Sequence, residues 1–355
     1  MNKRFQAPLV ALGFLLATIA LIVAQTNWRA TARTNTAAAG RAAAATPGTA
    51  LSELPASDIV IFVDTQRLLT DTLPNFLAAD PTLFARINAK LDKFQQETGI
   101  NPRSFDSLAI GVRFSSSNAQ RSRDPRFVAI ARGSFVASDL IESGFAAARK
   151  REKVEREEQI YEGKKIYVMG SARVTTADGE PVVRADDHRM AVAELDGNTI
   201  VLGDLEGVRS TVNPSAARVE QALVDLATRT PGAFAGFAGN LPPGMAKGLG
   251  FGNSKADKLA DSVRQVYGSL STVGTNAETL IAARTETADQ ARDIAQALNA
   301  LKLVSKLGMG RGSNQAQAEA LSSVIRGLTV TAQDNEVEIK LSVTQPDIAP
   351  LMRSF

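Results

Sequence analysis

Residues 190–212 read MAVAELDGNTIVLGDLEGVRSTV, and this stretch decides the fold class. Strand-like runs flank Asp196-Gly197-Asn198, a turn signal that is typical of a tight hairpin between antiparallel strands. A helical pattern begins directly after Asp204. The stretch therefore predicts a hairpin followed by a helix, which favours an antiparallel α+β fold over a doubly wound parallel sheet.

A similar order of elements occurs at the C-terminal end. Residues 328–352 read LTVTAQDNEVEIKLSVTQPDIAPLM, with Asp334-Asn335 as the turn between two alternating strands. Ahead of each hairpin, two strand-like runs lead into an amphipathic helix. These runs are residues 107–114 and 127–132, before a helix that buries Val136, Leu140, Ile141, Phe145 and Ala148, and residues 265–273 and 279–284, before a helix from Ala288. We therefore predict two related halves, residues 51–230 and 231–355, each an antiparallel sheet with helices on one face.

Two aspartates stand where a predicted strand ends and a helix begins. Asp64 follows the run 58–63, and Asp204 follows the second strand of the hairpin. Strand ends often carry catalytic carboxylates, but a carboxylate there also accepts a hydrogen bond from a helix N–H. We predict that both aspartates are helix caps, and that Thr287 and Gln290 form a capping box at a later helix.

Two further segments are expected at the surface. Residues 149–158, RKREKVEREE, mix basic and acidic side chains, which predicts the solvated end of a helix. Residues 172–185 predict an inserted β-hairpin that turns at Asp178-Gly179 and protrudes as a contact element.

The N-terminus carries the clearest signal of cellular placement. Lys3 and Arg4 precede the uncharged run 7–24, APLVALGFLLATIALIVA, which as a helix spans about 27 Å of a hydrocarbon core of about 30 Å. Basic residues keep that end cytoplasmic, so the body is expected on the extracytoplasmic side of the inner membrane. Trp28 and Arg29 are expected at the membrane interface. Residues 25–50, rich in Ala and Thr, predict a flexible tether.

Two fates of this apolar span stay open. A signal anchor would remain in the membrane, whereas a signal peptide would be cut after Ala24 and leave the body periplasmic or secreted. The length of the run and the bulky Ile22 near the cleavage point favour the anchor.

Composition excludes several classes of function. The chain has 355 residues and no cysteine, so disulfides, thiolate nucleophiles, cysteine-based metal centres and lipoprotein acylation are excluded. Forty basic and 37 acidic residues leave a net charge of only +3, without the clustered basic excess that nucleic-acid binding needs. No nucleic-acid partner is expected.

Two surface elements are candidate contact sites. The loop with Arg121, Arg123 and Arg126 is one-sidedly basic and suits lipid headgroups or an acidic partner. The glycine-rich stretch 244–252 carries the apolar side chains Met245, Leu249 and Phe251. Neither this stretch nor residues 308–312 contains the Gly-x4-Gly-Lys-Ser/Thr pattern of a phosphate loop.

The single histidine does not indicate a metal site. His188 adjoins Asp186 and Asp187, but consecutive residues of an extended chain point to opposite faces. We therefore predict no catalytic residue, no cofactor and no metal ligand.

Two segments of the first half carry a family resemblance. Residues 54–69, LPASDIVIFVDTQRLL, and 98–112, TGINPRSFDSLAIGV, resemble the openings of uncharacterised exported bacterial proteins of duplicated α+β build. The resemblance implies export and architecture, and it brings no activity.

The hypothesis that follows is a non-enzymatic, membrane-tethered envelope protein that acts as a structural or partner-binding module. Another envelope protein is the expected partner. Two alternatives remain open: a carrier of an apolar small molecule in a cleft between the halves, and a hydrolase that uses carboxylates distant in sequence.

Overall fold

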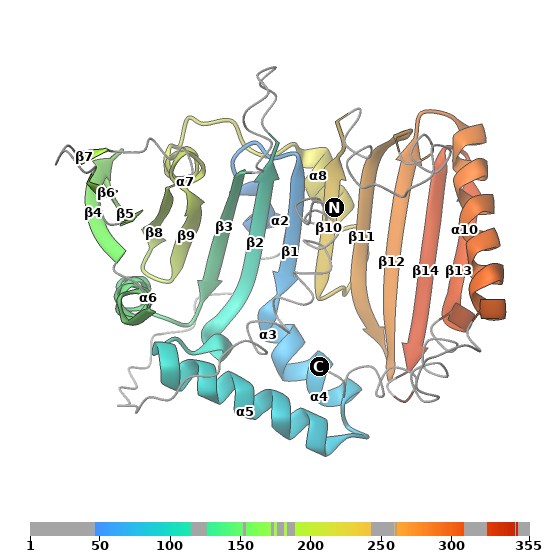
Figure 1. Cartoon of the computed structure of the whole chain (residues 1–355), viewed down its shortest axis with the longest axis horizontal. Helices are drawn as coiled ribbons and strands as arrows, with labels where there is room; N and C mark the ends of the chain where they lie inside the picture. The colour runs from blue at the N-terminus through green and yellow to red at the C-terminus, as the bar shows by residue number, and fades with distance from the viewer. Residues whose placement is uncertain are drawn as a thin grey trace. The chain divides into compact units, whose positions relative to one another are not determined.

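The computed structural model describes residues 47–114, 126–151, 154–171, 174–175, 181–182, 189–242, 259, 261–308, 325–344 and 346. These residues form two compact units (Figure 1). The first unit takes its described residues from Asn27–Arg67 and Leu91–Asp225, and the second from Leu68–Lys90 and Leu226–Phe355. Both are α+β units of antiparallel strands with helices packed against them, as the hairpin patterns predicted.

The first unit contains strands in the order β1-β2-β3-β9-β8-β5-β4. Their bounds are β1 (Ile59–Asp64), β2 (Phe105–Arg113), β3 (Arg126–Gly133), β4 (Val154–Tyr161), β5 (Lys164–Ser171), β8 (Met190–Asp196) and β9 (Thr199–Asp204). The short strands β6 (Val174–Thr175) and β7 (Pro181–Val182) pair with each other, within the predicted hairpin 172–185. Strands β8 and β9 turn at Gly197 and Asn198, so residues 190–212 fold as their sequence predicted.

Helices cover both faces of this sheet. The helices of this unit are α2 (Pro47–Ser52), α3 (Thr65–Arg67), the 3-10 helix η2 (Pro102–Ser104), α6 (Ala137–Arg151), α7 (Leu205–Val212) and the part of α8 (Gln221–Ala227) up to Asp225. On one face, α6 packs Leu140 and Phe145 into a core that includes Ile200. The next residue, Val201, is fully buried on the other face, where α7 contacts β8 and β9. The cover thus extends beyond the single face predicted, because both sides of these strands are apolar.

The second unit contains strands in the order β13-β14-β12-β11-β10. Their bounds are β10 (Ala235–Asn240), β11 (Val263–Val273), β12 (Asn276–Thr285), β13 (Leu328–Gln333) and β14 (Glu336–Thr344). Helix α10 (Ala288–Gly308) runs beside β13 and β14 (Figure 1). It buries Ala291 and Ala295 against Val330 and Val337, which is the amphipathic packing predicted for the helix from Ala288.

The segment after β1 groups with the second unit up to residue 90, although the sequence predicted a continuous first half from 51 to 230. It contains the π-helix η1 (Leu68–Thr72), α4 (Leu73–Phe76) and the part of α5 (Pro81–Thr98) up to Lys90. Phe76, Leu77 and Leu83 form a small core that packs against Ala277 of β12. This grouping rests on side-chain contacts between segments far apart in the sequence.

The predicted helix caps are present. The carboxylate of Asp64 accepts a hydrogen bond from the N–H of Arg67 at 2.8 Å, and Asp204 caps α7. At the start of α10, Thr287 and Gln290 exchange hydrogen bonds of 3.0 and 3.3 Å between side chain and backbone. These positions confirm the capping interpretation of both aspartates and the capping box.

The charged run 149–158 folds differently from its prediction. Helix α6 ends at Arg151, and β4 begins at Val154, so the prediction of a solvated helix end was wrong for the second half of the run. A tight turn joins β4 to β5, whose Ile166 and Val168 are fully buried. The charged residues from Val154 onward therefore form a strand because they pair with the apolar strand β5. The composition of the run 149–158 did not indicate this pairing. The prediction that Val136 is buried was also wrong, since it precedes α6 and is 38% exposed.

The N-terminal predictions fall outside the described residues. These include the span 7–24 and the interfacial residues Lys3, Arg4, Trp28 and Arg29. Among the residues that are described, no helix is long and apolar enough to cross a membrane. Helix α2 begins at Pro47, inside the predicted tether 25–50, and buries Ala50. The duplication stays a prediction, because the first unit contains the hairpin β4–β5 in addition to the order of elements that the sequence indicated.

Candidate functional site

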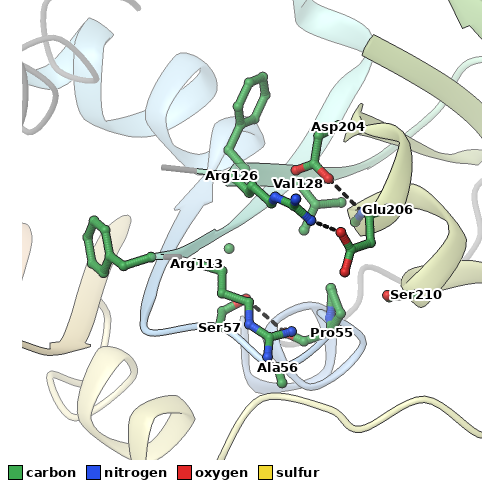
Figure 2. A pocket seen from close by; sticks show the side chains of 13 residues that line it. Pro55, Ala56, Ser57, Arg113, Arg126, Val128, Asp204, Glu206 and Ser210 are labelled. Carbon is green, nitrogen blue, oxygen red and sulfur yellow. Dashed lines mark hydrogen bonds and ion pairs between the residues drawn. The ribbon is translucent and has the colours of Figure 1, made fainter. Parts of the chain in front are cut away.

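A pocket of about 460 Å³ lies beside α7 in the first unit (Figure 2). One wall is the loop Pro55–Ser57, which leads from α2 to β1. The opposite wall is α7, with Glu206 and Ser210. The ends of β2 and β3 lie between these walls and supply the floor and the rim.

The floor is formed by two residues paired across the sheet, Gly111 of β2 and Val128 of β3. A Cβ at position 111 would overlap the hydroxyl oxygen of Ser57. That hydroxyl donates a hydrogen bond of 2.8 Å to the carbonyl oxygen of Pro55. Glycine on the strand therefore allows the loop to lie directly on the sheet, and the floor carries no charge.

Two arginines occupy opposed strand positions at the rim, and their guanidinium groups extend in different directions (Figure 2). Arg113 of β2 and Arg126 of β3 are directly opposite in the strand register, where like charges repel. Arg126 forms an ion pair with Glu206, drawn as a dashed line in Figure 2. Arg113 is exposed and has no ion pair with any described residue. Among the described residues, the rim thus presents one guanidinium with a carboxylate partner and one without.

The carboxylates of the pocket are engaged within the protein. Asp204 is 4% exposed, and its Oδ1 accepts the N–H of Gly207 at 2.8 Å as the cap of α7. Glu206 is held by Arg126. Among the described lining residues, no histidine or lysine accompanies the hydroxyls of Ser57 and Ser210. The described lining thus combines an uncharged floor with charged groups at the rim.

No metal centre is evident in the part of the chain that the structure describes. No group of three or more histidine, aspartate and glutamate side chains gathers there in a way that would hold an ion.

A polar network in the second unit is the other notable cluster. Tyr267 of β11 is 1% exposed and donates a hydrogen bond of 2.5 Å to Glu336 of β14. Arg284 of β12 donates to the other carboxylate oxygen at 2.8 Å, and Arg229 donates to the Tyr267 oxygen. The guanidinium groups of Arg229 and Arg284 lie 5.2 and 5.3 Å from the centre of the tyrosine ring.

The network shifts the ionisation of both acidic groups. Burial and the hydrogen bond to Glu336 raise the pKa of Tyr267 to about 12. Burial also acts to raise the pKa of Glu336, but hydrogen bonds from Tyr267 and Arg284 outweigh it and lower that pKa below its usual value. At neutral pH the protonated tyrosine therefore donates its hydrogen bond to a charged carboxylate, and this pairing stabilises the folded structure.

One of the predicted contact residues lies at the pocket. Arg126 stands on its rim, at the first residue of β3. The other predicted contacts lie outside the described residues: Arg121, Arg123, Met245, Leu249 and Phe251. Asp186, Asp187 and His188, for which no metal site was predicted, lie outside them as well.

Sequence reasoning did not single out Ser57, Arg113 or Glu206, which the fold brings together. Arg113 was open to prediction, because strands predicted at 107–114 and 127–132 form a hairpin that sets Arg113 close to Arg126. Ser57 and Glu206 are far from both in the sequence, and only the packing of the α2 loop and α7 onto the sheet brings them near.

Comparisons with known proteins give only distant likenesses. No family model matches the chain, and no curated protein matches its sequence. Three crystal forms of TP0453, a protein of the bacterium Treponema, are similar in structure. Form I has a TM-score of 0.40 at 9% identity over 88% of this chain and 99% of that one. Form III has a TM-score of 0.42 at 9% identity, over 86% of this chain and 98% of that one. Form IV has a TM-score of 0.40 at 10% identity, over 85% of this chain and 95% of that one. These values describe a loose resemblance to a bacterial protein.

Proposed function

We propose that this chain is a non-enzymatic, membrane-tethered envelope protein whose first unit binds a protein partner through the pocket beside α7. The docking group is an acidic side chain or the C-terminal carboxylate of that partner. The observation that carries the proposal is Arg113, which forms no ion pair with a described residue and lies directly opposite the ion-paired Arg126 in the strand register. The membrane tether is the uncharged run 7–24, with the body on the extracytoplasmic side.

A carboxylate is the group that best completes this rim. Two arginines in directly opposed positions repel each other, and Glu206 neutralises only Arg126. A second carboxylate placed on Arg113 would balance the remaining charge. The planar guanidinium fork also matches the two oxygens of a carboxylate in a bidentate pair.

The dimensions and floor suit a docked side chain. A volume of about 460 Å³ falls within the range of about 300–1,000 Å³ of ligand pockets. The uncharged floor at Gly111 and Val128 would contact the aliphatic part of the docked group, while its acidic end reaches Arg113. This separation of apolar floor and charged rim favours a residue of a larger partner.

The two alternative functions receive less support from this pocket. A hydrolase needs two available carboxyl groups, whereas Asp204 and Glu206 are each engaged by the protein itself. A carrier of apolar molecules needs a mostly apolar lining, and charged groups surround this one. Both remain predictions of the sequence.

Photo-crosslinking in intact cells tests the proposal. A photoreactive amino acid at position 210, on the wall formed by α7, should give a discrete crosslinked product of the full-length chain. We expect Arg113→Glu to abolish the product, because the reversed charge repels an acidic partner. The matched control, Arg292→Glu, changes an exposed arginine of α10 and should leave the product unchanged.

The identity of the product decides the chemistry. Mass spectrometry should place an aspartate, a glutamate or a C-terminus of another protein next to position 210. A crosslink to lipid, or a protein product that survives Arg113→Glu, would contradict the proposal.

A further inference from the structure

The strand order of the first unit ends at β4, whose outer edge has no neighbouring strand among the described residues. Strand β4 joins β5 through a two-residue turn at Glu162 and Gly163, both with positive φ. The residues that flank such a turn, Tyr161 and Lys164, form a hydrogen-bonded pair, and the pairing alternates from there. The residues at positions 154, 156, 158 and 160 therefore direct their backbone N–H and C=O groups away from β5.

No described element covers this edge, in contrast to the outer edge of the second unit. There, α10 lies along β13, and Asn299 and Lys302 donate hydrogen bonds to the carbonyl oxygens of Val330 and Leu328. Such cover prevents further strands from adding to an edge. No described side chain caps β4 in this way, and its Ile160 is 76% exposed. An exposed apolar side chain on an unpaired edge favours the addition of another strand.

We propose that β4 pairs antiparallel with β4 of a second copy of this chain, about a two-fold axis at Glu157. In this register Arg156 lies opposite Glu158 of the second copy, and Glu158 lies opposite its Arg156. Opposite charges in directly opposed positions stabilise antiparallel strands. The surface is therefore self-complementary, as a two-fold interface requires.

The charges also exclude the neighbouring registers. A shift of two residues in one direction places Arg156 opposite Arg156, and a shift in the other direction places Glu158 opposite Glu158. Both arrangements bring like charges together at the axis. A shift of one residue presents backbone groups that already bond β5. The charged residues of β4 thus disfavour other pairings of this edge and favour one register between two copies of β4.

Contacts within each copy hold the two charged side chains in place. The guanidinium of Arg156 lies 4.1 Å from the centre of the Tyr167 ring and donates a hydrogen bond of 2.5 Å to Glu142. Glu158 forms an ion pair of 2.8 Å with Lys165. Side chains that are already ordered lose less conformational freedom on association.

The opposite face of the strand tolerates the two-fold axis. Glu157 would lie opposite Glu157 of the second copy. Within each copy, however, Arg189 forms an ion pair of 2.8 Å with the Glu157 carboxylate. The two Cα atoms at this non-hydrogen-bonded position would be about 4.5 Å apart. That separation lies within the range of about 4.4–6.8 Å found in disulfides.

Cysteine substitution tests the register directly, because the chain has no cysteine of its own. Mild oxidation of the purified full-length Glu157→Cys chain in detergent should give a product of twice the chain mass. The matched control is Gln159→Cys, on the same face of the same strand. Its two copies would be four residues apart along the strand, about 14 Å at about 3.4 Å per residue, which is beyond disulfide reach. We expect the position 157 variant to crosslink at least about tenfold faster.

Charge reversal tests the pairing that selects the register. In the position 157 cysteine background, Glu158→Arg alone and Arg156→Glu alone should each slow crosslinking about tenfold, since like charges then face each other. A mixture of the two variants restores opposite charges in both pairs and should recover the crosslink as a mixed dimer. Recovery in the mixture also shows that Arg156→Glu still folds, although it removes the contact with Tyr167.

Two results would overturn the dimer. Equal crosslinking at positions 157 and 159 would contradict the register, and full crosslinking by the single charge variants would contradict the role of Arg156 and Glu158. None of these variants touches the pocket beside α7, so the dimer and the proposed partner site can fail independently.

Discussion

At the scale of single residues, two glycines differ in whether their surroundings leave space for a Cβ atom. Gly133, at the end of β3, lies so close to η2 that an added Cβ would overlap the carbonyl oxygen of Ser104. The neighbouring N–H of Ser134 donates a hydrogen bond of 2.7 Å to that same oxygen. Gly144, in α6, has open space where a Cβ would lie. Only the first glycine is needed for packing.

Alanine substitution should therefore act in opposite directions at these positions. We expect Gly133→Ala to lower the free energy of unfolding by about 1–3 kcal/mol, because η2 must move away from the strand. Gly144→Ala should raise it by about 0.5–1 kcal/mol through its higher helix propensity. Chemical denaturation of both variants beside the parent protein checks the prediction. Equal effects of the two substitutions would show that the close approach at Gly133 is not limiting.

At the scale of elements, the network around Tyr267 ties β11, β12 and β14 together. The pKa of Tyr267 is raised in the folded protein, so its contribution to stability is complete below about pH 10 and is lost as the pH rises to about 12. The pKa of Glu336 is lowered, so its contribution is present above about pH 4.3 and is lost as the pH falls further. The network therefore stabilises these strands across the neutral range.

Alkaline titration monitored by tyrosinate absorbance checks this arrangement. The chain has three tyrosines, and one should ionise with a pKa of about 12 while the protein is folded. Tyr267→Phe should remove that late step. Glu336→Gln should lower the pKa of Tyr267, because the tyrosine then loses its anionic acceptor and keeps two arginines nearby. A late step that persists in Tyr267→Phe would assign it to another tyrosine.

At the scale of the whole molecule, the proposals concern where the chain is held and what it meets. A span at residues 7–24 would keep every copy in one membrane and raise the local concentration of bodies. Edge pairing through β4 becomes more favourable under that constraint, because the loss of translational freedom has already occurred. The partner pocket and the dimer edge lie on separate surfaces of the first unit, with no residue in common.

Cell fractionation checks the placement. The full-length chain should sediment with membranes and resist extraction by high salt, because an apolar span is held by the hydrophobic effect and not by charge. A variant that lacks residues 1–24 should remain in the cytosolic fraction, since it has no export signal. Full-length protein found dissolved in the cytosol would contradict both the anchor and the extracytoplasmic body.

The candidate site was only partly open to prediction from the sequence. Arg126 was singled out as a member of a basic loop, and Asp204 was assigned correctly as a helix cap. The pocket itself was not predicted. Its walls are the loop at Ser57 and α7, and about 150 residues separate these two segments in the chain. Sequence spacing does not report such distant contacts.

Patterns along the chain determined the hairpin of residues 190–212, the α+β class and the caps at Asp64, Asp204 and Thr287, because turns and caps depend on hydrogen bonds between near neighbours. Tertiary structure alone decided that the charged run after α6 becomes the edge strand β4, and that Arg113 and Arg126 meet beside Glu206. Both outcomes depend on burial against distant segments, such as β5 and α7, and burial is a property of the assembled fold.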